Sequence, residues 1–194
     1  MNTRTALLAT ASAVVLVAGV SLGLQEKTGA PSEAGMKMDE FPMPKPTKEH
    51  EWLKSQIGTW DATVSCPMMG EPSKGTQTTK AFSDFTIVSE FKGEMMGQPF
   101  TGMGFTTYDP LKKKYVSTWC DSMMPGIYVS EGTVDAGGKK LTSTGEACNM
   151  ENALADCTNV LEIKSPDEHV FTMYETSKGA SDPSAMKIEY KRRK

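Results

Sequence analysis

The stretch FTGMGFTTYDPLKKKYVSTWCD, residues 100–121, decides the fold of this chain. It holds a strand-like run at 100–108, a tight turn at 109–112 and a second strand-like run at 114–121. In the turn, Pro110 presets φ and Asp109 can hydrogen-bond its own backbone, so the pattern predicts a β-hairpin. The same unit recurs between Gly58 and Arg192, with further tight turns at 135–138 and 165–168.

Longer connections alternate with these tight turns. They cover residues 66–75, 95–100, 122–126, 148–157 and 177–185. Short and long links in alternation are typical of an up-and-down meander that is tight at one end and loose at the other. About ten short strands at this spacing favour a closed barrel, which has no edge strands, over an open sandwich. We therefore expect an all-β fold, an antiparallel up-and-down β-barrel of about ten strands with one short N-terminal helix.

The helix is expected at residues 47–57. Thr47 can cap its N-terminus, Glu49 and Glu51 lie where the helix dipole favours acids, and Gly58 can end it.

The first and last strands of the predicted barrel show clean alternation. At 59–66 and 186–192, one face carries the following residues: Trp60, Ala62, Val64, Cys66, Met186, Ile188, Tyr190 and Arg192. Barrel closure would bring these strands together, so Arg192 can point inward over Trp60. The alternative, in which Arg192 turns outward at the terminus, stays open.

The N-terminal segment predicts export. Arg4 precedes an apolar run at 6–24, which is typical of a signal peptide and just long enough for a membrane anchor, so cleavage and retention both stay open. Residues 25–46 have the composition of a flexible linker, and 47–194 form the barrel domain. We expect a periplasmic or extracellular protein that meets a membrane only through its N-terminal segment. A net charge of −3 argues against a nucleic-acid partner.

Several motifs occur in an order that resembles an uncharacterised bacterial family, domain of unknown function 1579. The resemblance covers nearly everything after Pro44 and rests on the following: Gly58-Thr59-Trp60, Met96-Gly97-Gln98-Pro99-Phe100, Gly104-Phe105, Tyr108-Asp109-Pro110, Lys114-Tyr115-Val116, Thr118-Trp119 and Asp121-Ser122-Met123. The family implies no catalytic residues. A wider similarity, to lipocalin-like (calycin) barrels, rests on Gly58, Trp60 and Arg192, and it implies a basic side chain over the first-strand tryptophan.

Sulfur-bearing residues are expected at the loose end of the barrel, opposite the helix. In a meander, the odd-numbered strands all end at one rim, which gathers the following residues into a mouth: Met68, Met69, Met95, Met96, Met123 and Met124. Methionine can be adaptable packing, a flexible entrance for a lipophilic ligand, or part of a soft-metal site. The metal-ligand spacing Met-x-x-Met or Cys-x-x-Cys is missing from these connections, and we predict no metal ligands.

The chain has four cysteines, and in an exported protein pairing is the commoner state. We predict a disulfide between Cys148 and Cys157, which would close one long loop at its base. Cys66 and Cys120 would then remain. Cys66 is in the inward phase while Cys120 can point outward, and that arrangement would keep the two apart.

Catalysis and haem binding find little support in the sequence. His50 lies on the helix and His169 begins a strand at the tight end, so neither of the two histidines falls at the mouth beside a nucleophile. His169 is the one candidate for an axial haem ligand. Asp121 and Glu131 are the acids expected to point inward.

The leading prediction is a non-catalytic protein that holds a small apolar or amphipathic molecule inside the barrel. The interior would be lined by Trp60, Phe105, Trp119 and Tyr190, with Asp121 and Arg192 as polar contacts. The alternatives are a structural or protein-interaction module with a filled core, a haem or soft-metal binding barrel, and an enzyme of unknown chemistry.

Overall fold

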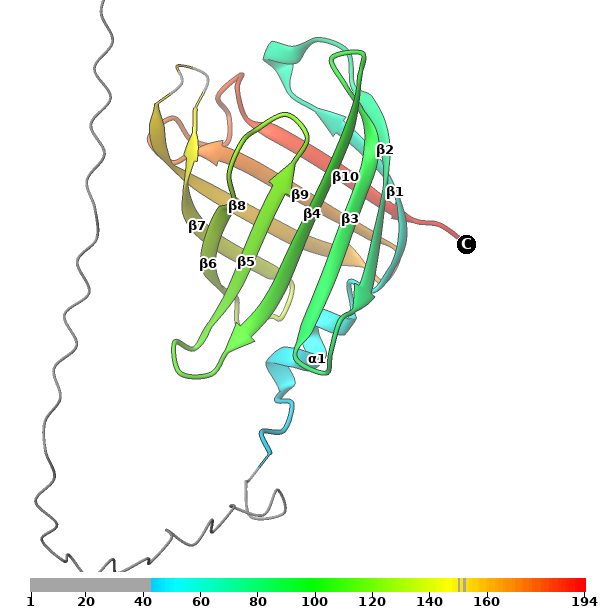
Figure 1. Ribbon diagram of the computed structural model, residues 1–194, viewed down its shortest axis with the longest axis vertical. Helices are drawn as coiled ribbons and strands as arrows, with labels where there is room; N and C mark the ends of the chain where they lie inside the picture. The colour runs from blue at the N-terminus through cyan, green and yellow to red at the C-terminus, as the bar shows by residue number, and fades with distance from the viewer. Residues whose placement is uncertain (1–42, 150, 152) are drawn as a thin grey trace, which may run out of the picture. The chain divides into compact units, whose positions relative to one another are not determined.

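The computed structural model describes residues 43–149, 151 and 153–194. They form a closed barrel in which each strand pairs antiparallel with its neighbours in chain order, and β10 closes against β1 (Figure 1). The predicted all-β, up-and-down barrel is therefore confirmed. The predicted export segment at 1–24 and most of the linker at 25–46 lie outside the described residues. Within the described part, no helix is long and apolar enough to cross a membrane.

The strands follow the expected meander closely. Their bounds are β1 Gly58–Ser65, β2 Ser73–Ala81, β3 Thr86–Met95, β4 Gln98–Asp109, β5 Lys114–Asp121, β6 Tyr128–Val134, β7 Lys140–Cys148, β8 Leu154–Ser165, β9 Glu168–Glu175 and β10 Met186–Arg192. The connection from β1 to β2 contains a short 3-10 helix, Pro67–Met69.

Closure depends on the register between the two terminal strands. Trp60 lies opposite Arg192, and Val64 lies opposite Ile188, with unbroken antiparallel pairing between them. The alternation predicted for these strands is therefore the alternation between barrel interior and solvent. Because closure pairs the backbone groups of both strands, the sheet has no unpaired edge.

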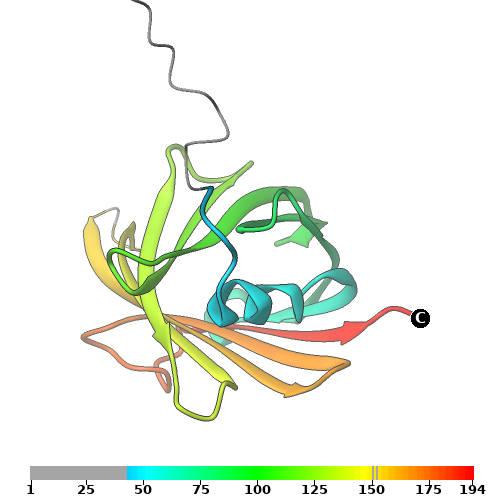
Figure 2. The ribbon, with the colours of Figure 1, turned by 90° about the horizontal axis from the view of Figure 1, so that it is seen from below.

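The helix α1, Lys48–Lys54, lies across one end of the barrel (Figure 2). It is shorter than predicted because the next three amides, from Ser55 to Ile57, bond to carbonyls three residues back and tighten the chain. At its start, the Thr47 backbone N–H donates to Nδ1 of His50 at 3.0 Å. Leu53, 1% exposed, packs into the barrel end and closes it.

Two apolar clusters fill the interior from the helix end upward. The first contains Leu53, Ile87, Tyr115 and Leu141 under the helix. The second contains Trp60, Ala62, Val64, Phe91, Phe100, Ile188 and Tyr190. The connections that precede β2, β4, β6, β8 and β10 all lie at the other end, opposite α1 (Figure 1). We call this other end the open end, and the end covered by α1 the closed end.

Candidate functional site

The inward-facing side chains differ in burial along the barrel, and at the open end buried positions such as Phe100 and Cys157 lie among half-buried aromatic rings. Near α1, Trp60 is 0% exposed and Tyr115 is 4% exposed. Near the open end, the inward-facing Trp119, Tyr128 and Phe171 are only half-buried. Large aromatic side chains that face a closed barrel and keep solvent contact are typical of a binding surface. The open-end interior is therefore the candidate site.

Trp119 is hydrogen-bonded at this end to Asp121. The indole Nε1 donates to Asp121 Oδ2 at 3.1 Å, and Asp121 Oδ1 accepts the backbone N–H groups of Met123 and Met124 at 2.8 and 2.9 Å. A Cβ at Gly102, on the adjacent strand β4, would overlap the Trp119 ring. The carboxylate thus ties the start of the β5–β6 connection to the tryptophan, and glycine makes room for the ring.

A polar wall extends from Tyr128 down the interior of β6, β7 and β8. Asn159 Nδ2 donates to Tyr128 Oη at 2.6 Å and to Ser143 Oγ at 3.4 Å, and Ser143 Oγ donates to Ser130 Oγ at 3.4 Å. Asn159 is 4% exposed, yet its Oδ1 has no hydrogen-bond partner among the described residues. Burial raises the pKa of the Tyr128 phenol. An unsatisfied buried carbonyl oxygen costs about 1–3 kcal/mol, and this one faces the interior.

The opposite wall is apolar. The half-buried Phe171, Met186 and Met95 pack on the cluster that contains Phe91 and Ile188. The open-end interior is therefore amphipathic, with hydroxyl and amide groups on one side and aromatic and thioether groups on the other.

Glu175 adds a carboxylate at the upper rim of this interior. It lies opposite the inward-facing Cys157 in the β8–β9 register. Hydrogen bonds from Lys178 and then Ser177, at 2.9 and 2.8 Å, hold the pKa of the Glu175 carboxyl below its usual range.

These residues belong to a segment with recognisable relatives. A family model described as "Protein of unknown function (DUF1579)" matches residues 45–192. The chain belongs to the DUF1579 family. No curated protein sequence matches the DUF1579 chain.

Among solved structures, the DUF1579 chain is similar to several small barrels. The S-type phycobiliprotein lyase CPES from Guillardia theta is 12% identical, with a TM-score of 0.46, 78% of this chain covered and 99% of that chain. A de novo designed fluorescence-activating β-barrel is 17% identical, with a TM-score of 0.43 and coverage of 73% and 96%. The redesigned barrel mFAP1, bound to DFHBI, is 15% identical, with a TM-score of 0.40 and coverage of 73% and 97%.

Arg192 of the DUF1579 chain points inward over Trp60, as one of the two sequence hypotheses held. Its Cζ lies 4.0 Å from the Trp60 ring centroid. Its Nη1 donates to the Ile57 carbonyl at 2.8 Å, Nη2 to Ser55 at 3.2 Å and Nε to Pro166 at 3.0 Å. All three guanidinium nitrogens donate to backbone carbonyls at the closed end. Trp60 and Arg192 therefore belong to the contacts that close the barrel beneath α1, and they lie away from the open end.

Tyr190 occupies the middle of the interior, 6% exposed, and its hydroxyl donates to Gln77 Oε1 at 3.0 Å. It packs beside His169, whose ring centroid lies 3.9 Å from that of Trp60. Burial, and then the charge of Arg192, lower the pKa of His169 to about 4. His169 is thus a packed core side chain at the closed end. Among the described residues, no group of three or more His, Cys, Asp or Glu could hold a metal ion.

Two predicted inward positions are wrong. Phe105 is 39% exposed and packs edge-on against Phe82 outside the barrel. On β4 the residues that face inward are Gly102, Gly104 and the others in alternation with them. Glycine is needed there because a Cβ would overlap the Trp119 ring. Glu131 also faces outward, where it pairs with Lys112 and Lys114.

The predicted disulfide between Cys148 and Cys157 is wrong as well. Cys157 is a free thiol opposite Gly145, whereas Cys148 lies opposite Leu154. Regular pairing of β7 with β8 therefore offsets the two cysteines by three residues, too far for a bridge. Burial raises the pKa of the Cys157 thiol.

The other two cysteines are separate free thiols. Cys66 is buried at the end of β1 and donates to the carbonyls of Pro183 and Ser184 at 3.6 and 3.5 Å. Cys120 is exposed on the outside of β5, where its thiol donates to the Met103 carbonyl at 3.6 Å.

The predicted methionines do gather at the open end. Met68, Met96, Met123 and Met124 are exposed there, Met69 is half-buried, and Met95 packs on the interior apolar cluster. Next to this rim, exposed apolar side chains cover the outside of β4–β6: Met103, Phe105, Ile127 and Val129. The rim of the open end is thus bordered by thioether and aliphatic groups on its outer side.

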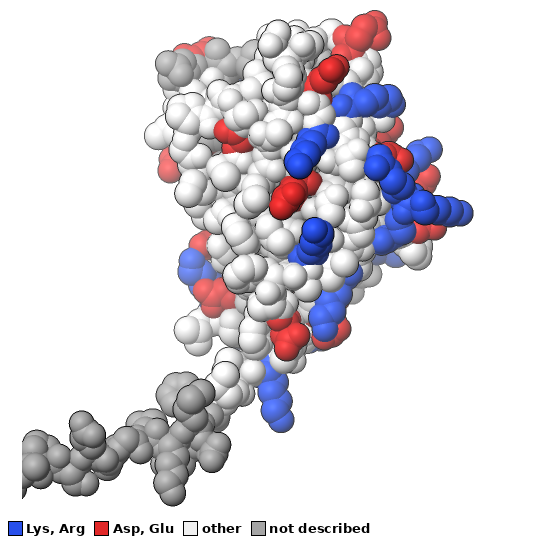
Figure 3. Space-filling model, turned by 45° about the vertical axis from the view of Figure 1, so that its right-hand side comes forward, with Lys and Arg blue, Asp and Glu red and all other residues white. Residues whose placement is uncertain are grey.

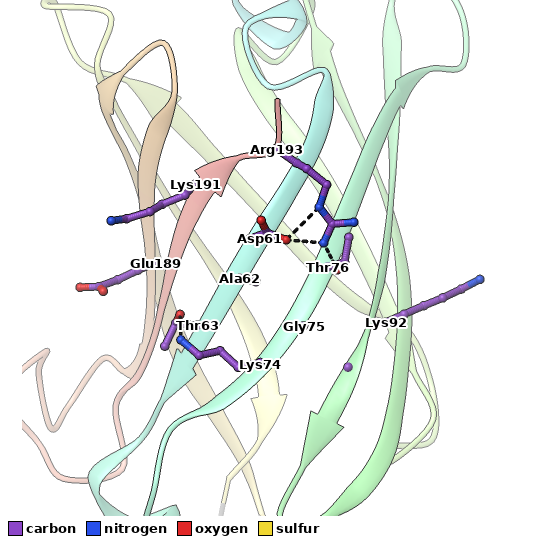
Figure 4. Close-up of a pocket in the computed structure, with 11 residues that line it drawn as sticks. Asp61, Ala62, Thr63, Lys74, Gly75, Thr76, Lys92, Glu189, Lys191 and Arg193 are labelled. Carbon is purple, nitrogen blue, oxygen red and sulfur yellow. Dashed lines mark hydrogen bonds and ion pairs between the residues drawn. The ribbon is translucent and has the colours of Figure 1, made fainter.

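The outer surface also carries two hollows. One of about 850 Å³ crosses β10, β1, β2 and β3, and Figure 4 shows Arg193 paired with Asp61 and donating to Thr76. In the same view Lys92 and Lys191 point away from one another. The second, about 430 Å³, lies beside the connections that follow β1 and β9. Figure 3, which brings the side of the barrel with β1 and β2 forward, shows lysine and arginine side chains interspersed with acidic ones on this surface. The charged side chains around the larger hollow are of both signs and do not converge on one point. We therefore assign the candidate site to the barrel interior.

Sequence reasoning missed Tyr128, Ser143, Asn159 and Phe171. Their signal was a polar or aromatic side chain at the inward phase of a strand. That phase became known only once each strand was paired with its neighbours, because a shift of one residue exchanges the two faces.

Proposed function

We propose that this barrel binds a small amphipathic molecule at its open-end interior and does not transform it. The observation that carries the proposal is the Asn159 Oδ1 acceptor, which is buried beside the half-buried Tyr128 and finds no partner within the described residues. Native proteins rarely leave such an atom unsatisfied, and a bound donor would satisfy it. The polar wall would orient that donor while the apolar wall receives the rest of the molecule.

The apolar wall supplies a driving force of ordinary size. Burial of apolar surface yields roughly 25 cal/mol per Å², so a ligand that buries about 200 Å² against this wall gains about 5 kcal/mol before its entropic costs. Methionine side chains such as Met95 and Met186 suit a ligand of variable shape because they repack easily.

Binding fits the site better than catalysis does. Both histidines are engaged in packing or capping: His50 accepts a hydrogen bond from the Thr47 backbone N–H, and the His169 ring packs at a tilt against Trp60. Both carboxylate oxygens of Asp121 accept hydrogen bonds, Oδ2 from the Trp119 indole and Oδ1 from two backbone amides. At the open end Glu175 lies opposite the Cys157 thiol, but Lys178 and Ser177 engage that carboxylate. Burial also raises the pKa of the Cys157 thiol, which disfavours the thiolate that would act as a nucleophile.

We further propose that the barrel works outside the cytoplasm. The support is the apolar run at 6–24 after Arg4 in the sequence. Fractionation of the full chain, with N-terminal sequencing of the product, tests this, and recovery of the intact chain from the cytoplasm would contradict it.

The binding proposal is tested with a neutral fluorescent probe, N-phenyl-1-naphthylamine, displaced by 1-decanol. Ala155 and Asp156 are adjacent on β8 but face opposite sides, inward and outward. We expect Ala155→Trp to fill the open end and abolish probe binding, while Asp156→Trp binds like the wild type. Absence of saturable binding by the wild type, or equal binding by both variants, would refute the proposal.

A further inference from the structure

We infer that the ligand of the open-end interior is an amphipathic amine, carried as its ammonium, and that the barrel rejects fatty-acid anions. This inference rests on the proposed function and adds the chemical class of the ligand. It comes from the signs of the charges around the site and from the kind of hydrogen-bonding group left without a partner.

The charges that face the interior at this end have one sign. Among the described residues, the inward-facing ionised side chains there are Asp121 and Glu175. The inward-facing cation, Arg192, lies at the closed end with its nitrogens donating to backbone carbonyls. A carboxylate ligand would therefore approach two carboxylates, and the cation beside them, Lys178, is already paired with Glu175.

Acidic residues also outnumber basic ones around the rim of the open end. The acids that lie in the open-end connections or within three residues of them are Glu71, Glu94, Asp121, Glu146, Glu151, Asp156, Glu175 and Asp182. The corresponding bases are fewer: Lys74, Lys178 and Lys187. At the closed end the balance reverses, with lysines in the turns that follow β4 and β6. The field along the barrel axis therefore draws cations toward the entrance and repels anions from it.

The unpartnered atom is an acceptor. Asn159 Oδ1 is a carbonyl oxygen in a residue that is 4% exposed, and it has no partner in the part of the chain that the structure describes, so a donor from a bound molecule would complete it. An ammonium group has such donors and a carboxylate has none. A hydrogen bond to a charged donor is also worth more than one to a hydroxyl.

The surroundings of Asn159 connect it to both carboxylates. Tyr128, its hydrogen-bond partner, lies opposite Trp119, whose indole donates to Asp121. On the other side, Asn159 lies opposite Met173, two residues from Glu175. An ammonium bound to Asn159 thus has an acid on either side. The two neighbouring aromatic rings can add cation–π attraction.

The test compares decylamine, 1-decanol and decanoate by isothermal titration calorimetry at pH 7 and low salt, where the amine is cationic. We expect decylamine to bind about tenfold more tightly than 1-decanol, and decanoate to bind at least about tenfold more weakly than the alcohol. The preference should shrink as salt is raised from about 20 to about 300 mM, because the Debye length falls.

Single substitutions test which residues produce the preference for the amine over the alcohol. Glu175→Gln should lower the decylamine-to-decanol ratio about threefold, whereas Glu146→Gln, on the outward face at the same end, should leave it within about 1.5-fold. Lys178→Met removes the cation paired with Glu175 and should raise the ratio. Asn159→Leu should lower decylamine affinity more than decanol affinity.

The outcomes separate the two proposals. If none of the three probes binds, the proposed function itself fails. If 1-decanol binds but decylamine binds no more tightly, or decanoate binds best, the barrel remains a binding protein and the amine assignment is wrong. Equal effects of Glu175→Gln and Glu146→Gln would also overturn the assignment.

Discussion

Acid should weaken this barrel through His169, which lies between Trp60 and Tyr190 in the interior. The side chain is 4% exposed, and burial followed by the Arg192 charge lowers its pKa from 6.5 to about 4. The folded protein therefore keeps this imidazole neutral at a pH where the unfolded chain takes up a proton. The two aromatic neighbours offer no acceptor that would compensate the charge.

The sign and size follow from proton linkage. Above pH 6.5 the residue is neutral in both states, so the full stability is present. Between pH 6.5 and about pH 4 the unfolded state binds the proton first, and the free energy of unfolding falls as the pH falls. A displacement of this size corresponds to about 3 kcal/mol lost by pH 4, a large part of the stability of an ordinary domain.

The assay is urea unfolding at pH 7, 5.5 and 4, followed by tryptophan fluorescence. The carboxylates of the protein also titrate in this range, so the control is the variant His169→Phe, which keeps a ring against Trp60 and removes the proton. The difference in unfolding free energy between wild type and variant should shift by about 3 kcal/mol against the wild type from pH 7 to pH 4. Parallel pH profiles for the two proteins would refute the assignment.

Three further predictions test other parts of the account. Replacing Arg192 with methionine should cost about 2–4 kcal/mol in urea unfolding, because it removes the cation–π contact and leaves carbonyls at the closed end without donors; an effect below about 0.5 kcal/mol would place the guanidinium outside the closure. Phe91→Ala should cost about 3–5 kcal/mol by the same measurement, and Phe105→Ala less than about 1 kcal/mol, since the first side chain is 4% exposed and the second 39%; equal costs would contradict the face assignment of β4. Alkylation of the native protein, mapped by mass spectrometry, should modify Cys120 rapidly and Cys157 only after unfolding, and recovery of Cys157 in a disulfide would contradict the strand register.

The architecture was readable from the sequence because its signals are local. Turn residues such as Asp109-Pro110 mark the tight links, and the alternation around Trp60 and around Tyr190 marks the two strands that close the barrel. Each of these signals depends on neighbouring residues alone, and together they predict the meander and its closure.

The site was readable only in part, because its features depend on pairing between distant strands. Phe105 looked inward by its aromatic character, yet the Trp119 ring takes that space and leaves glycine on the inward phase of β4. Glu131 was assigned by the phase of its apolar neighbours, which turn out to lie on the outside. The Cys157 disulfide was inferred from separation along the chain, but only the β7–β8 register sets the actual separation.

The indole and amide protons at the two ends of the barrel offer the most direct test of the central claim, that the open-end interior receives the ligand. In ¹H–¹⁵N spectra recorded during titration with 1-decanol, the account predicts saturable shifts of the Trp119 indole and the Asn159 side-chain amide. The Trp52 indole, which donates to the Gly138 carbonyl at the closed end, should stay in place. Shifts confined to the outer groove around Lys74 and Thr76, or no saturable shift at Trp119, would contradict it.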